Sequence, residues 1–395
     1  MNQSIIHSYP DLMVLGSTGS VGEQAVDVAR AHAIPLRAVT AHRSVSAVEA
    51  QIREFHPDFA VLTDIAAASD LAVRVADTNT RVLAGFEGIT EVLHTVRTEN
   101  PLGITVENSI LGEAGLLPTL ETLKAGHKLA LANKESLVVG GELVMSLARE
   151  KGTTILPVDS EHCAIFQCLR AGRSEEIKKI LLTASGGPFY GYTKAQLQTV
   201  TKAMTLNHPT WKMGAKITVD SATLMNKGFE VIEAVHLFGV TPEQVEVIVH
   251  RESMIHSMVE YIDHSIIAQM SVPDMRHCVQ YALTHPRRLP AGGTLAEADL
   301  FSLGKLTFGR PDTAVFPLLA LACDCIKAGG ALPCVLNAAN EIIVAAFLHD
   351  SIRFCEIPEL VARVVADLHH TSAWHTYDRL MEADTLARET AERLL

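Results

Sequence analysis

The sequence predicts an α/β protein in which a doubly wound domain is followed by a central α+β domain and a C-terminal helical bundle. Short apolar runs alternate with helical patterns over residues 1–150. Strand-like runs separated by polar loops follow in residues 151–290. Beyond about residue 312, apolar residues recur only at the three- and four-residue spacing of helices. These changes of pattern define the predicted domains.

In residues 1–150, apolar runs predict strands and periodic segments predict helices. The strands are expected at 12–15, 36–40, 59–62 and 103–106, and the helices at 23–31 and 48–55. Ser46 and Glu49 have the spacing of a capping box at the start of the second helix. Because strands that alternate with helices pair in parallel, this region is expected to form a Rossmann-like sheet.

The later boundaries rest on strand runs, chain breaks and helical periodicity. Further strands are expected at 180–183, 245–249, 257–262 and 266–270. Residues 291–311 are rich in glycine and proline and are predicted to form a linker. Residues 312–395 are predicted to form the helical domain, with the clearest periodicity at 335–347 and 360–368.

The charge balance argues against several classes of partner. The 395 residues include 33 Lys and Arg against 45 Asp and Glu, a formal net charge of −12. Nucleic acid and anionic membrane surfaces are therefore not expected partners, since both require a basic face. No uncharged apolar run reaches the length of a membrane span, because the best candidate, from Ala314, contains Asp324.

The cysteines and the first residues indicate the compartment. None of the seven cysteines forms a C-x-x-C motif, so free, packed thiols are expected rather than a disulfide framework. The first ten residues lack the basic segment of a secretory signal, and an apparent strand follows at once. We therefore expect a cytoplasmic location.

A glycine-rich turn, G-S-T-G-S-V-G at residues 16–22, follows the first predicted strand. The dinucleotide-binding fingerprint is G-x-G-x-x-G at the start of a helix. Here Thr18 occupies the middle glycine position, so the strict pattern fails. The turn still offers glycines and accessible N–H groups, and Ser17, Thr18 and Ser20 add hydroxyl donors. The order strand, turn, helix favours a nucleotide site.

The second predicted strand ends in T-A-H-R-S, residues 40–44. At this position NAD enzymes place an acid against the ribose 2′-hydroxyl, whereas NADP sites use an arginine. Arg43 lies there, and no acidic residue of the segment competes with it. A solvated loop arginine explains the residue as well when it is taken by itself. Together with the glycines, Arg43 favours NADP(H).

Two acids one residue apart end a short apolar run in P-V-D-S-E-H, residues 157–162. In an extended segment Asp159 and Glu161 would point to the same side. Two like charges held so close repel each other unless a cation, a proton or solvent intervenes. A solvated loop is the alternative interpretation of this pair.

A helix beginning near Leu224 would place Asn226, Lys227 and Glu230 on one face. An ordinary surface Lys–Glu pair accounts for the same spacing. Alternatively, Glu230 is a third carboxylate for a cation, while Ser221 and Lys227 hold a phosphate. Three carboxylate ligands suit Mg²⁺ or Mn²⁺, and the sequence does not choose between the two ions.

Two further loops have compositions typical of ligand contact. T-A-S-G-G-P-F, residues 183–189, places Ser185 beside two glycines, which suits an oxyanion, although a plain turn is the alternative. N-H-P-T-W-K-M-G, residues 207–214, holds His208 and Trp211 between a proline and a glycine. This loop is either a lid over a ligand or a packing contact.

Taken together, these motifs resemble one family, the 1-deoxy-D-xylulose 5-phosphate reductoisomerases of the non-mevalonate isoprenoid pathway. The resemblance covers nearly the whole chain in the order of the family. It rests on G-S-T-G-S-V-G, L-A-N-K-E-S (131–136), V-D-S-E-H, T-A-S-G-G-P-F, N-H-P-T-W-K-M-G, V-D-S-A-T-L-M-N-K-G-F-E, I-H-S-M-V-E (255–260) and L-N-A-A-N-E (336–341).

The resemblance implies a metal-dependent rearrangement of a phosphorylated ketose, followed by reduction with NADPH to 2-C-methyl-D-erythritol 4-phosphate. It implies that Asp159, Glu161 and Glu230 hold the divalent metal, which is Mg²⁺ or Mn²⁺. The metal would polarise the substrate carbonyl as a Lewis acid. Trp211 and Met213 match a lid over the substrate. A homodimer is also implied.

The same resemblance assigns site residues. The catalytic residues would be Lys134, Asp159, Glu161, His208 and Glu230. The substrate contacts would be Lys134, Ser160, Glu161, Ser185, His208, Trp211, Ser221, Asn226, Lys227 and Glu230. The cofactor contacts would be Gly16, Thr18, Gly19, Ser20, Val21, His42, Arg43, Ser44, Asn133, Glu135 and Gly214.

The chain departs from the family pattern at two places. His42-Arg43-Ser44 stands where Gly-Lys-Asn or a similar triplet is common, which leaves the contacts to the 2′-phosphate open. Arg251-Glu252-Ser253 stands where Pro-Gln-Ser is usual, and we expect this change to lie outside the chemical motifs.

Two rival functions are compatible with parts of the pattern. A polyol-phosphate or homoserine-type dehydrogenase would turn over without metal. A nucleotide-sensing protein with a spent site would lack one of Lys134, Asp159, Glu161 or Glu230, and all four are present. Whether the rearrangement proceeds by fragmentation and recombination or by a direct shift is not encoded in any motif.

Overall fold

The computed structural model describes residues 10–211, 213–291, 295–369 and 376–395. The chain forms two compact units, each built from separate segments. The first unit comprises Met1–Asn133, Ser146–Asp159 and Asp274–Ala296, and the second comprises Lys134–Met145, Ser160–Pro273 and Glu297–Leu395. The parts of the predicted domains and linker that fall on residues 1–9, 292–294 and 370–375 lie outside the described residues.

The first unit contains a seven-stranded parallel sheet with the order β4-β3-β2-β1-β5-β6-β7, which confirms the predicted Rossmann-like fold. Its strands are β1 (Leu12–Leu15), β2 (Leu36–Ala41), β3 (Phe59–Leu62), β4 (Arg81–Ala84), β5 (Thr105–Asn108), β6 (Lys128–Leu131) and β7 (Ile155–Pro157). The strand order reverses at β1, which lies between β2 and β5. In open parallel sheets this point is where nucleotides bind, and the glycine-rich turn follows β1.

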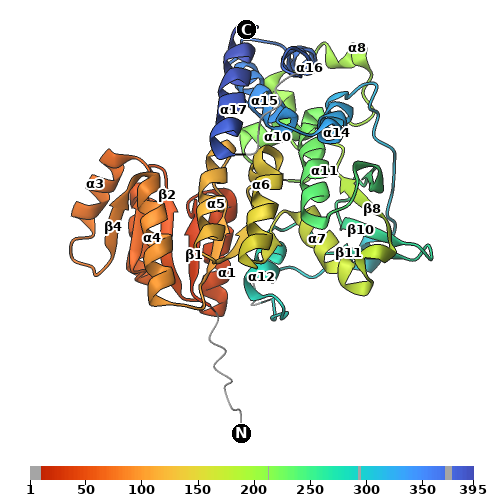
Figure 1. Cartoon of the computed structure of the whole chain (residues 1–395). Coiled ribbons are helices and arrows are strands. Elements are labelled where there is room, and N and C mark those ends of the chain that lie inside the picture. Colours follow the sequence, from red (N-terminus) through yellow and green to blue (C-terminus); the bar gives the residue numbers. More distant parts are fainter. Residues whose placement is uncertain (1–9, 212, 292–294, 370–375) are drawn as a thin grey trace. The chain divides into compact units, whose positions relative to one another are not determined.

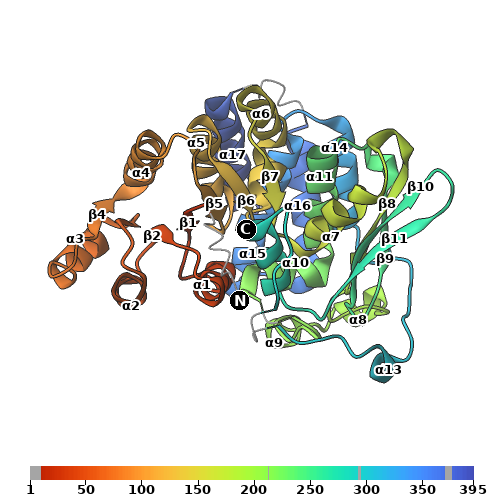
Figure 2. The same ribbon diagram turned by 90° about the horizontal axis from the view of Figure 1, so that it is seen from below.

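Helices cover both faces of this sheet. They are α1 (Ser20–His32), α2 (Val45–Phe55), α3 (Ile65–Arg74), α4 (Gly85–Glu99), η1 (Glu113–Gly115), α5 (Leu116–Lys124) and α12 (Arg276–Thr284). Figure 2 shows α4 and α5 on one face and α1 and α2 on the other. The helix α6 (Glu135–Lys151) begins in the second unit and ends in the first, with a non-helical residue at Gly140.

The predicted capping box of Ser46 and Glu49 is wrong. The helix α2 begins two residues earlier than this box requires, with Ser44 at the N-cap and Ser46 inside the first turn. The backbone N–H of Val48 donates to the carbonyl of Ser44, at 3.0 Å. The Glu49 carboxylate instead accepts from Arg53 one turn later.

The second unit is built on a mixed four-stranded sheet with the order β11-β10-β8-β9. Its strands are β8 (Ile177–Ala184), β9 (Val245–Val249), β10 (Ile255–Tyr261) and β11 (Ile266–Met270), which match the predicted runs to within three residues. β8 and β9 are parallel, whereas β10 runs antiparallel to β8 and to β11. The strand β11 forms one edge of the sheet.

The remaining elements of the second unit are helical. They are α7 (Ser160–Cys168), η2 (Leu169–Ala171), η3 (Ser174–Glu176), α8 (Lys194–Leu197), α9 (Lys202–Thr205), α10 (Ala215–Thr223), α11 (Met225–Phe238), η4 (Pro242–Gln244), α13 (Leu300–Leu303), α14 (Leu318–Ala328), α15 (Leu332–Leu348), η5 (Phe354–Glu356), α16 (Ile357–Asp367) and α17 (Tyr377–Glu392). Figure 1 shows α15 beside α17, and α7 and α11 pack against the sheet.

One apolar core joins the sheet of the second unit to its C-terminal helices. It contains Ile180 of β8 and Ile232 of α11 together with Val335 of α15 and Val361 of α16. The described residues beyond 312 are helical outside their connections, as the periodicity predicted. The predicted division of the chain into a Rossmann-like domain (1–150), a catalytic domain (151–290), a linker (291–311) and a helical domain (312–395) stays a prediction.

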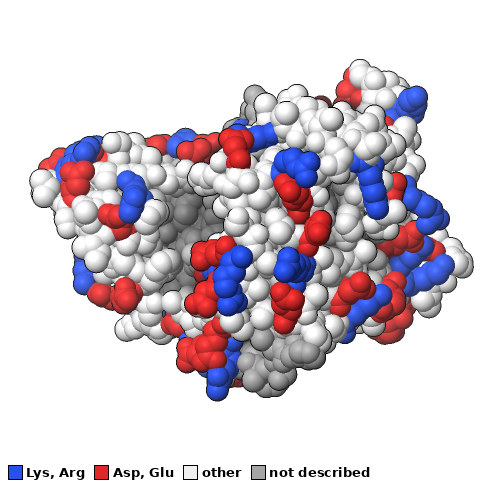
Figure 3. Space-filling model, turned by 90° about the horizontal axis from the view of Figure 1, so that it is seen from above, with Lys and Arg blue, Asp and Glu red and all other residues white. Residues whose placement is uncertain are grey.

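The surface carries interspersed charges of both signs. On the face drawn in Figure 3, lysine and arginine side chains lie beside aspartate and glutamate. Ion pairs such as Arg379–Glu382 on α17 are of this kind. All seven cysteines are free thiols, five of them buried. Among the described residues, no helix combines the length and the apolar character that crossing a bilayer requires.

Candidate active site

The acid pair lies at the start of a helix, so the extended geometry expected from the sequence is wrong. The strand β7 ends at Pro157 and α7 begins at Ser160. Asp159 therefore immediately precedes the helix, and Glu161 lies in its first turn. Acidic side chains are favoured at this end of a helix because its N–H groups carry partial positive charge.

The residues expected on one face of a helix do lie on α11. Asn226, Lys227 and Glu230 belong to its first two turns, and Lys227 and Glu230 are almost fully buried. The helix begins after Leu224, which adopts a left-handed conformation with φ of 62° and separates α10 from α11. This single residue turns the chain so that Ser221 of α10 and Asn226 of α11 come from different helices.

Two lysines and two glutamates of the second unit form what we call the acid–lysine cluster: Lys134, Glu161, Lys227 and Glu230. Lys134 Nζ donates to Glu230 Oε1 at 3.1 Å, and it also donates to Asn226 Oδ1 at 2.9 Å. Lys227 Nζ donates to Glu161 Oε1 at 2.8 Å and to Glu230 Oε2. Lys227 thus bonds to both glutamates, and Lys134 bonds to Glu230 as well.

The neighbouring glutamates together affect the pKa of the Lys227 ammonium group more than its burial does. Burial alone would lower the pKa of its ammonium group, but Glu161 and Glu230 together leave that pKa raised. Ser160 donates its hydroxyl to Glu161, so this side chain also belongs to the surroundings of the cluster. Lys134, Glu161, Lys227 and Glu230 of the second unit thus lie together, and their role as a site stays a prediction.

Asp159 is joined to this cluster by one peptide bond, since it adjoins Ser160. One carboxylate oxygen from each of Asp159, Glu161 and Glu230 lies within 4.8 Å of the other two. Three carboxylate oxygens at this spacing form a donor set of the kind that Mg²⁺ and Mn²⁺ take in proteins. The residues present therefore fit a divalent cation.

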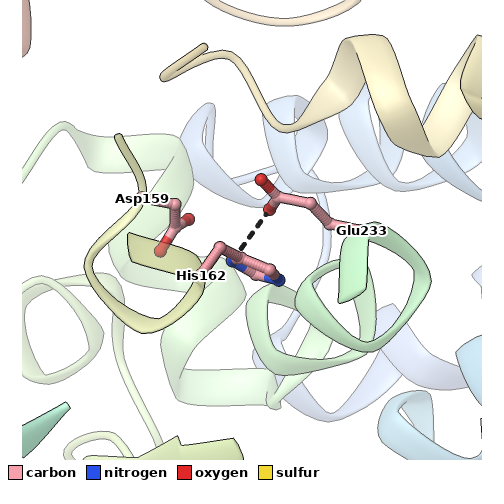
Figure 4. A group of neighbouring side chains, drawn as sticks. All are labelled: Asp159, His162 and Glu233. Carbon is pink, nitrogen blue, oxygen red and sulfur yellow. Dashed lines mark ion pairs between the residues drawn. The ribbon is translucent and has the colours of Figure 1, made fainter. Parts of the chain in front are cut away.

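Figure 4 shows a buried ion pair between His162 of α7 and Glu233 of α11, marked by a dashed line. His162 Nδ1 lies 3.3 Å from Glu233 Oε2, and its Nε2 lies 2.8 Å from the backbone carbonyl of Glu230. Because a carbonyl only accepts, Nε2 carries a proton. His162 thereby ties α7 to α11 at the residue that bears the Glu230 carboxylate. The sequence reasoning did not single out His162 or Glu233.

A second cluster lies around His208. Its Nε2 is 3.2 Å from the hydroxyl of Ser185 and 3.1 Å from that of Ser221. Its Nδ1 accepts from the backbone N–H groups of Thr210 and Trp211. The proton of the neutral ring is therefore on Nε2, directed at the two hydroxyls. Burial lowers the pKa of His208, and the charge of Arg251 lowers it further.

Ser221 is anchored by residues that the sequence reasoning passed over. Its neighbour Asp220 is buried, accepts from Asn340 Nδ2 at 2.8 Å and pairs with Lys216 at 2.9 Å. Lys216 also donates to Glu135, at 3.4 Å. Asn340 belongs to the L-N-A-A-N-E motif, so this motif of α15 holds α10 in place. Glu135, a predicted cofactor contact, is thus engaged within the second unit.

The glycine-rich turn of the first unit is built mainly from backbone contacts. Gly16 has φ of 84°, and its N–H donates to the carbonyl oxygen and the hydroxyl of Thr40. A Cβ on Gly22 would lie 2.1 Å from the carbonyl oxygen of Gly16, so the helix α1 can pack on the turn only without a side chain there. Gly19, Ser20 and Val21 follow at the start of α1.

One predicted hydroxyl donor of this turn is not available. Ser17 is fully buried, and its hydroxyl bonds to Gln51 Oε1 at 2.7 Å and to the Thr40 carbonyl at 3.2 Å. Burial of a polar side chain demands such partners, and sequence spacing did not reveal them. Thr18 and Ser20 are partly or fully exposed and stay candidate donors.

Arg43 has an acidic partner that the sequence reasoning did not expect. Its Nε donates to Asp64 Oδ2 at 2.8 Å, while its side chain stays 72% exposed. Asp64 comes from the next strand-to-helix loop, where it also caps α3 by accepting from Ala67. These contacts lower the pKa of Asp64, the Ala67 N–H more than Arg43. His42 contacts the Thr63 hydroxyl, and Ser44 is exposed at the N-cap of α2.

The other predicted contacts occupy loop positions. Asn133 donates to the carbonyls of Ile110 and Gly112, and thus fixes the turn after β5. Gly214 is exposed at the N-cap of α10. Trp211 is half-buried, with its ring 6.3 Å from that of His256, and Met213 is also half-buried. A lid role for these two residues stays a prediction.

Three family models together match most of the chain. The model for 1-deoxy-D-xylulose 5-phosphate reductoisomerase matches residues 12–141. Two models for C-terminal domains of the same enzyme match residues 155–238 and 270–390. The chain belongs to the 1-deoxy-D-xylulose 5-phosphate reductoisomerase family.

Relatives and solved structures of this family cover the chain almost completely. The reductoisomerase of Desulfitobacterium hafniense is 49% identical over 387 residues, which cover 97% of this chain and 99% of the relative. That of Acetivibrio thermocellus is 46% identical, with 97% and 99% coverage. The reductoisomerase of Zymomonas mobilis in complex with NADPH matches with a TM-score of 0.90 at 39% identity, covering 98% of this chain and 99% of that one.

A second solved structure is DOX-P reductoisomerase in complex with NADPH, fosmidomycin and magnesium. It matches with a TM-score of 0.89 at 37% identity and covers 97% of this chain and 98% of its own.

The expectation about the departure from the family pattern at Arg251 needs correction. Arg251 does not lie outside the chemical motifs, because its Nη1 donates to the carbonyl oxygens of Ser185 and Gly187. The error arose because a contact between residues 66 positions apart leaves no signal in local spacing. Arg251 is therefore the functional candidate that motif comparison passed over.

Proposed function

We propose that this chain is a 1-deoxy-D-xylulose 5-phosphate reductoisomerase that uses NADPH and a divalent metal ion. It would rearrange the carbon skeleton of the ketose phosphate to an aldehyde and reduce that aldehyde to 2-C-methyl-D-erythritol 4-phosphate. The observation that carries the proposal is the convergence of Asp159, Glu161 and Glu230 beside Lys134 and Lys227. Family membership supplies the reaction.

Asp159, Glu161 and Glu230 would hold the metal, Mg²⁺ or Mn²⁺. When bound, the ion would act as a Lewis acid on the substrate carbonyl. The charge balance supports this assignment, because three carboxylates face two ammonium groups and one negative charge is left over. A dication would reverse the sign of the cluster, which suits an anionic substrate.

The lysines and Asn226 would orient the groups that react. Lys134 already bonds to both Asn226 and Glu230, so its ammonium group has a fixed direction. Asn226 Nδ2 in turn donates to Glu230 Oε1 at 2.5 Å. A side-chain network whose members hold one another keeps its geometry without reorganisation during a reaction.

His208, Ser185 and Ser221 would bind the phosphate or hydroxyl groups of the substrate. The Nε2–H of His208 and the two hydroxyls are donors that meet at one place. The lowered pKa of His208 keeps its ring neutral near pH 7, so that it donates from Nε2 without adding charge. Trp211 and Met213 would close over the bound substrate.

The glycine-rich turn of the first unit supports NADPH as the reductant, which would supply the hydride. Its N–H groups lie at the start of α1, where the helix end favours the pyrophosphate. Arg43 would contact the 2′-phosphate, with its guanidinium shared with Asp64. Asn133, Glu135 and Gly214 are the further proposed cofactor contacts.

The test is NADPH oxidation by the purified protein with 1-deoxy-D-xylulose 5-phosphate and Mg²⁺ or Mn²⁺. Oxidation that requires both the substrate and the metal, and stops with a chelator, is the expected result. Oxidation that survives chelation would instead indicate a metal-independent dehydrogenase. Repeating the assay with each ion decides which of the two supports turnover.

We also propose that the chain forms a homodimer through β11. This edge strand exposes Ile266 by 52%, Ile267 by 38% and Met270 by 37%. An exposed apolar strand at a sheet edge is a surface to which another strand adds readily. Sedimentation should give a dimer for the wild type and a monomer for Ile266→Lys. A monomeric wild type would contradict the proposal.

The cellular context is part of the same proposal. An enzyme of this activity would operate in the cytoplasm, in the non-mevalonate route to isoprenoids. Loss of growth on depletion of the chain, rescued by 2-C-methyl-D-erythritol, would be the expected result. Growth unaffected by depletion would argue against this role.

A further inference from the structure

Arg251 lies on the turn after β9 and contacts the loop that carries Ser185. Its Nη1 donates to the carbonyl of Ser185 at 2.8 Å and to that of Gly187 at 2.6 Å. The guanidinium lies over the ring of Tyr190, 5.5 Å from its centroid. All these residues belong to the second unit, and Arg251 itself is half-buried.

The loop that Arg251 holds has an unusual backbone. Gly186 and Gly187 both have positive φ, of 77° and 64°. A Cβ on Gly187 would lie 2.7 Å from the carbonyl oxygen of Ser221, so the loop packs tightly on the end of α10. Ser185 Oγ accepts from the Gly187 N–H at 3.2 Å and faces His208. The position of the Ser185 hydroxyl therefore depends on this backbone.

Arg251 in turn packs on Tyr190, which contacts a paired strand end at Gly309. Gly309 pairs with Val249 through two backbone hydrogen bonds, of 2.8 and 2.9 Å. A Cβ on Gly309 would lie 2.2 Å from the Tyr190 hydroxyl, so this strand end packs directly against Tyr190. Tyr190 therefore packs at Gly309 through its hydroxyl end and presents a ring face to the Arg251 guanidinium.

We propose that Arg251 is a positioning residue of the phosphate subsite formed by Ser185, His208 and Ser221. It fixes the Ser185–Gly187 loop through the two carbonyls, and its positive charge favours a phosphate monoester dianion over an uncharged group at the same place. This proposal rests on the proposed function, since that function identifies the anion as the substrate phosphate.

Two physical effects are combined in this role. Two charge-assisted hydrogen bonds hold the carbonyls of Ser185 and Gly187 on the side of Arg251, which leaves the hydroxyl and the N–H groups of the loop for other partners. The charge also acts through space: burial lowers the pKa of His208, and the charge of Arg251 lowers it further. Removing the side chain removes both effects, whereas lysine keeps the charge.

The experiment compares Arg251→Gln, Arg251→Lys and the control Arg379→Gln, which removes the same charge from an exposed position of α17. For each protein, kcat is measured together with the Michaelis constants for the sugar phosphate substrate and for NADPH. Competitive inhibition by inorganic phosphate is measured in the same assay. Phosphate binding is also measured calorimetrically without NADPH or turnover.

In Arg251→Gln, KM for the sugar phosphate and the inhibition constant of phosphate should both rise about tenfold. KM for NADPH should stay at the wild-type value. The acid limb of kcat/KM should move to higher pH, because a charge that lowers the pKa of His208 is gone. Arg251→Lys should keep the acid limb and show a smaller rise in KM. Arg379→Gln should match the wild type.

Unchanged phosphate binding in Arg251→Gln would overturn the proposal, and so would equal losses for substrate and NADPH. If Arg251→Gln does not fold, Arg251→Lys tests the proposal. This variant should raise KM for the sugar phosphate while the acid limb of kcat/KM stays at its wild-type pH. A shifted acid limb in Arg251→Lys would overturn the proposal. Failure of the proposed function is seen separately, as a wild type without metal-dependent turnover. In that case the calorimetric comparison still tests the anion subsite.

Discussion

The glycine-rich turn of the first unit and the acid–lysine cluster of the second are built by opposite means. The turn depends on backbone: Gly16 at positive φ, N–H groups directed by Thr40, and a helix that fits only because Gly22 has no side chain. The cluster depends on charged side chains brought together from the start of α6, from α7 and from α11.

This difference determines what a mutation can damage. A backbone site is damaged by added volume, because nothing in it carries a charge to lose. A buried charged site is damaged by removal of any one member, because the remaining charges lose their compensation. Glu230→Gln and Gly22→Ala test this contrast directly, and changes at Arg43 and Glu107 follow with smaller expected effects.

Glu230→Gln should reduce kcat by about a thousandfold or more, because several kcal/mol of transition-state stabilisation by the metal would be lost. Lys134 and Lys227 both bond to this carboxylate, so the change removes the shared partner of two ammonium groups. NADPH binding, followed by fluorescence titration, should be unchanged. Loss of NADPH binding together with turnover would remove the basis for treating Glu230 as a ligand.

Gly22→Ala should weaken NADPH binding about fiftyfold, equivalent to loss of one charge-assisted hydrogen bond. The new Cβ would meet the Gly16 carbonyl at 2.1 Å and force the turn to move. Gly152→Ala is the control, since Gly152 has φ of 61° but no neighbour within 4 Å of an added Cβ. It should lower the melting temperature and leave NADPH affinity intact. If Gly152→Ala and Gly22→Ala lost the same NADPH affinity, general backbone strain would explain the effect of Gly22→Ala.

Arg43→Ala should raise KM for NADPH about tenfold and leave KM for NADH unchanged, since only NADPH has the 2′-phosphate. The reciprocal variant, Asp64→Asn, retains an oxygen that can cap α3 but releases Arg43 from its ion pair. It should strengthen the preference for NADPH by a factor of about two, because exposed ion pairs are weak. Coenzyme preference that stays constant in both variants would exclude Arg43 from the 2′-phosphate site.

Glu107→Gln should change stability in a pH-dependent way. Glu107 lies on β5 opposite Val14 of β1, fully buried, and burial raises its pKa to about 8. The unfolded chain loses this proton near pH 4.5, whereas the folded chain keeps it until about pH 8. Stability of the wild type is thus complete below pH 4.5 and falls as the pH rises through this window.

The Glu107→Gln variant has no carboxyl group to ionise at this position, so it does not lose stability as the pH rises. Its melting temperature relative to the wild type should rise by about 5 °C between pH 5 and pH 8. Glu23→Gln, at an exposed position of α1, should show no such trend. A difference that is the same at both pH values would mean that Glu107 is ionised in the folded chain.

The contrast between the two sites also explains how much the sequence could predict. The parallel sheet and the turn follow from local patterns, so strands 12–15, 36–40 and 59–62 match β1–β3 closely. The helix face of Asn226, Lys227 and Glu230 was predictable from spacing alone. Glu230 was offered from the residues alone as a third carboxylate beside the acid pair. The grouping with Lys134 came from family resemblance, because no local rule joins residues 96 positions apart.

The errors have the same origin. Asp159 and Ser160 are typical residues for a helix start, and this signal could have replaced the extended interpretation of the acid pair. The Arg43–Asp64 pair and the Arg251 contacts to the Ser185 loop had no such signal, since each joins loops that only the folded chain brings together. Ser17 was misjudged because its partner Gln51 lies on another helix.

Leu224, the left-handed residue between α10 and α11, limits how this segment can change in evolution. Ser221 and Glu230 lie on opposite sides of it, each fixed in direction by its own helix. Substitutions that keep both helices preserve the angle between these two side chains. An insertion between Met225 and Glu230 would rotate the carboxylate by about 100° around the axis of α11. Homologues should therefore keep the length of the segment 218–230 constant.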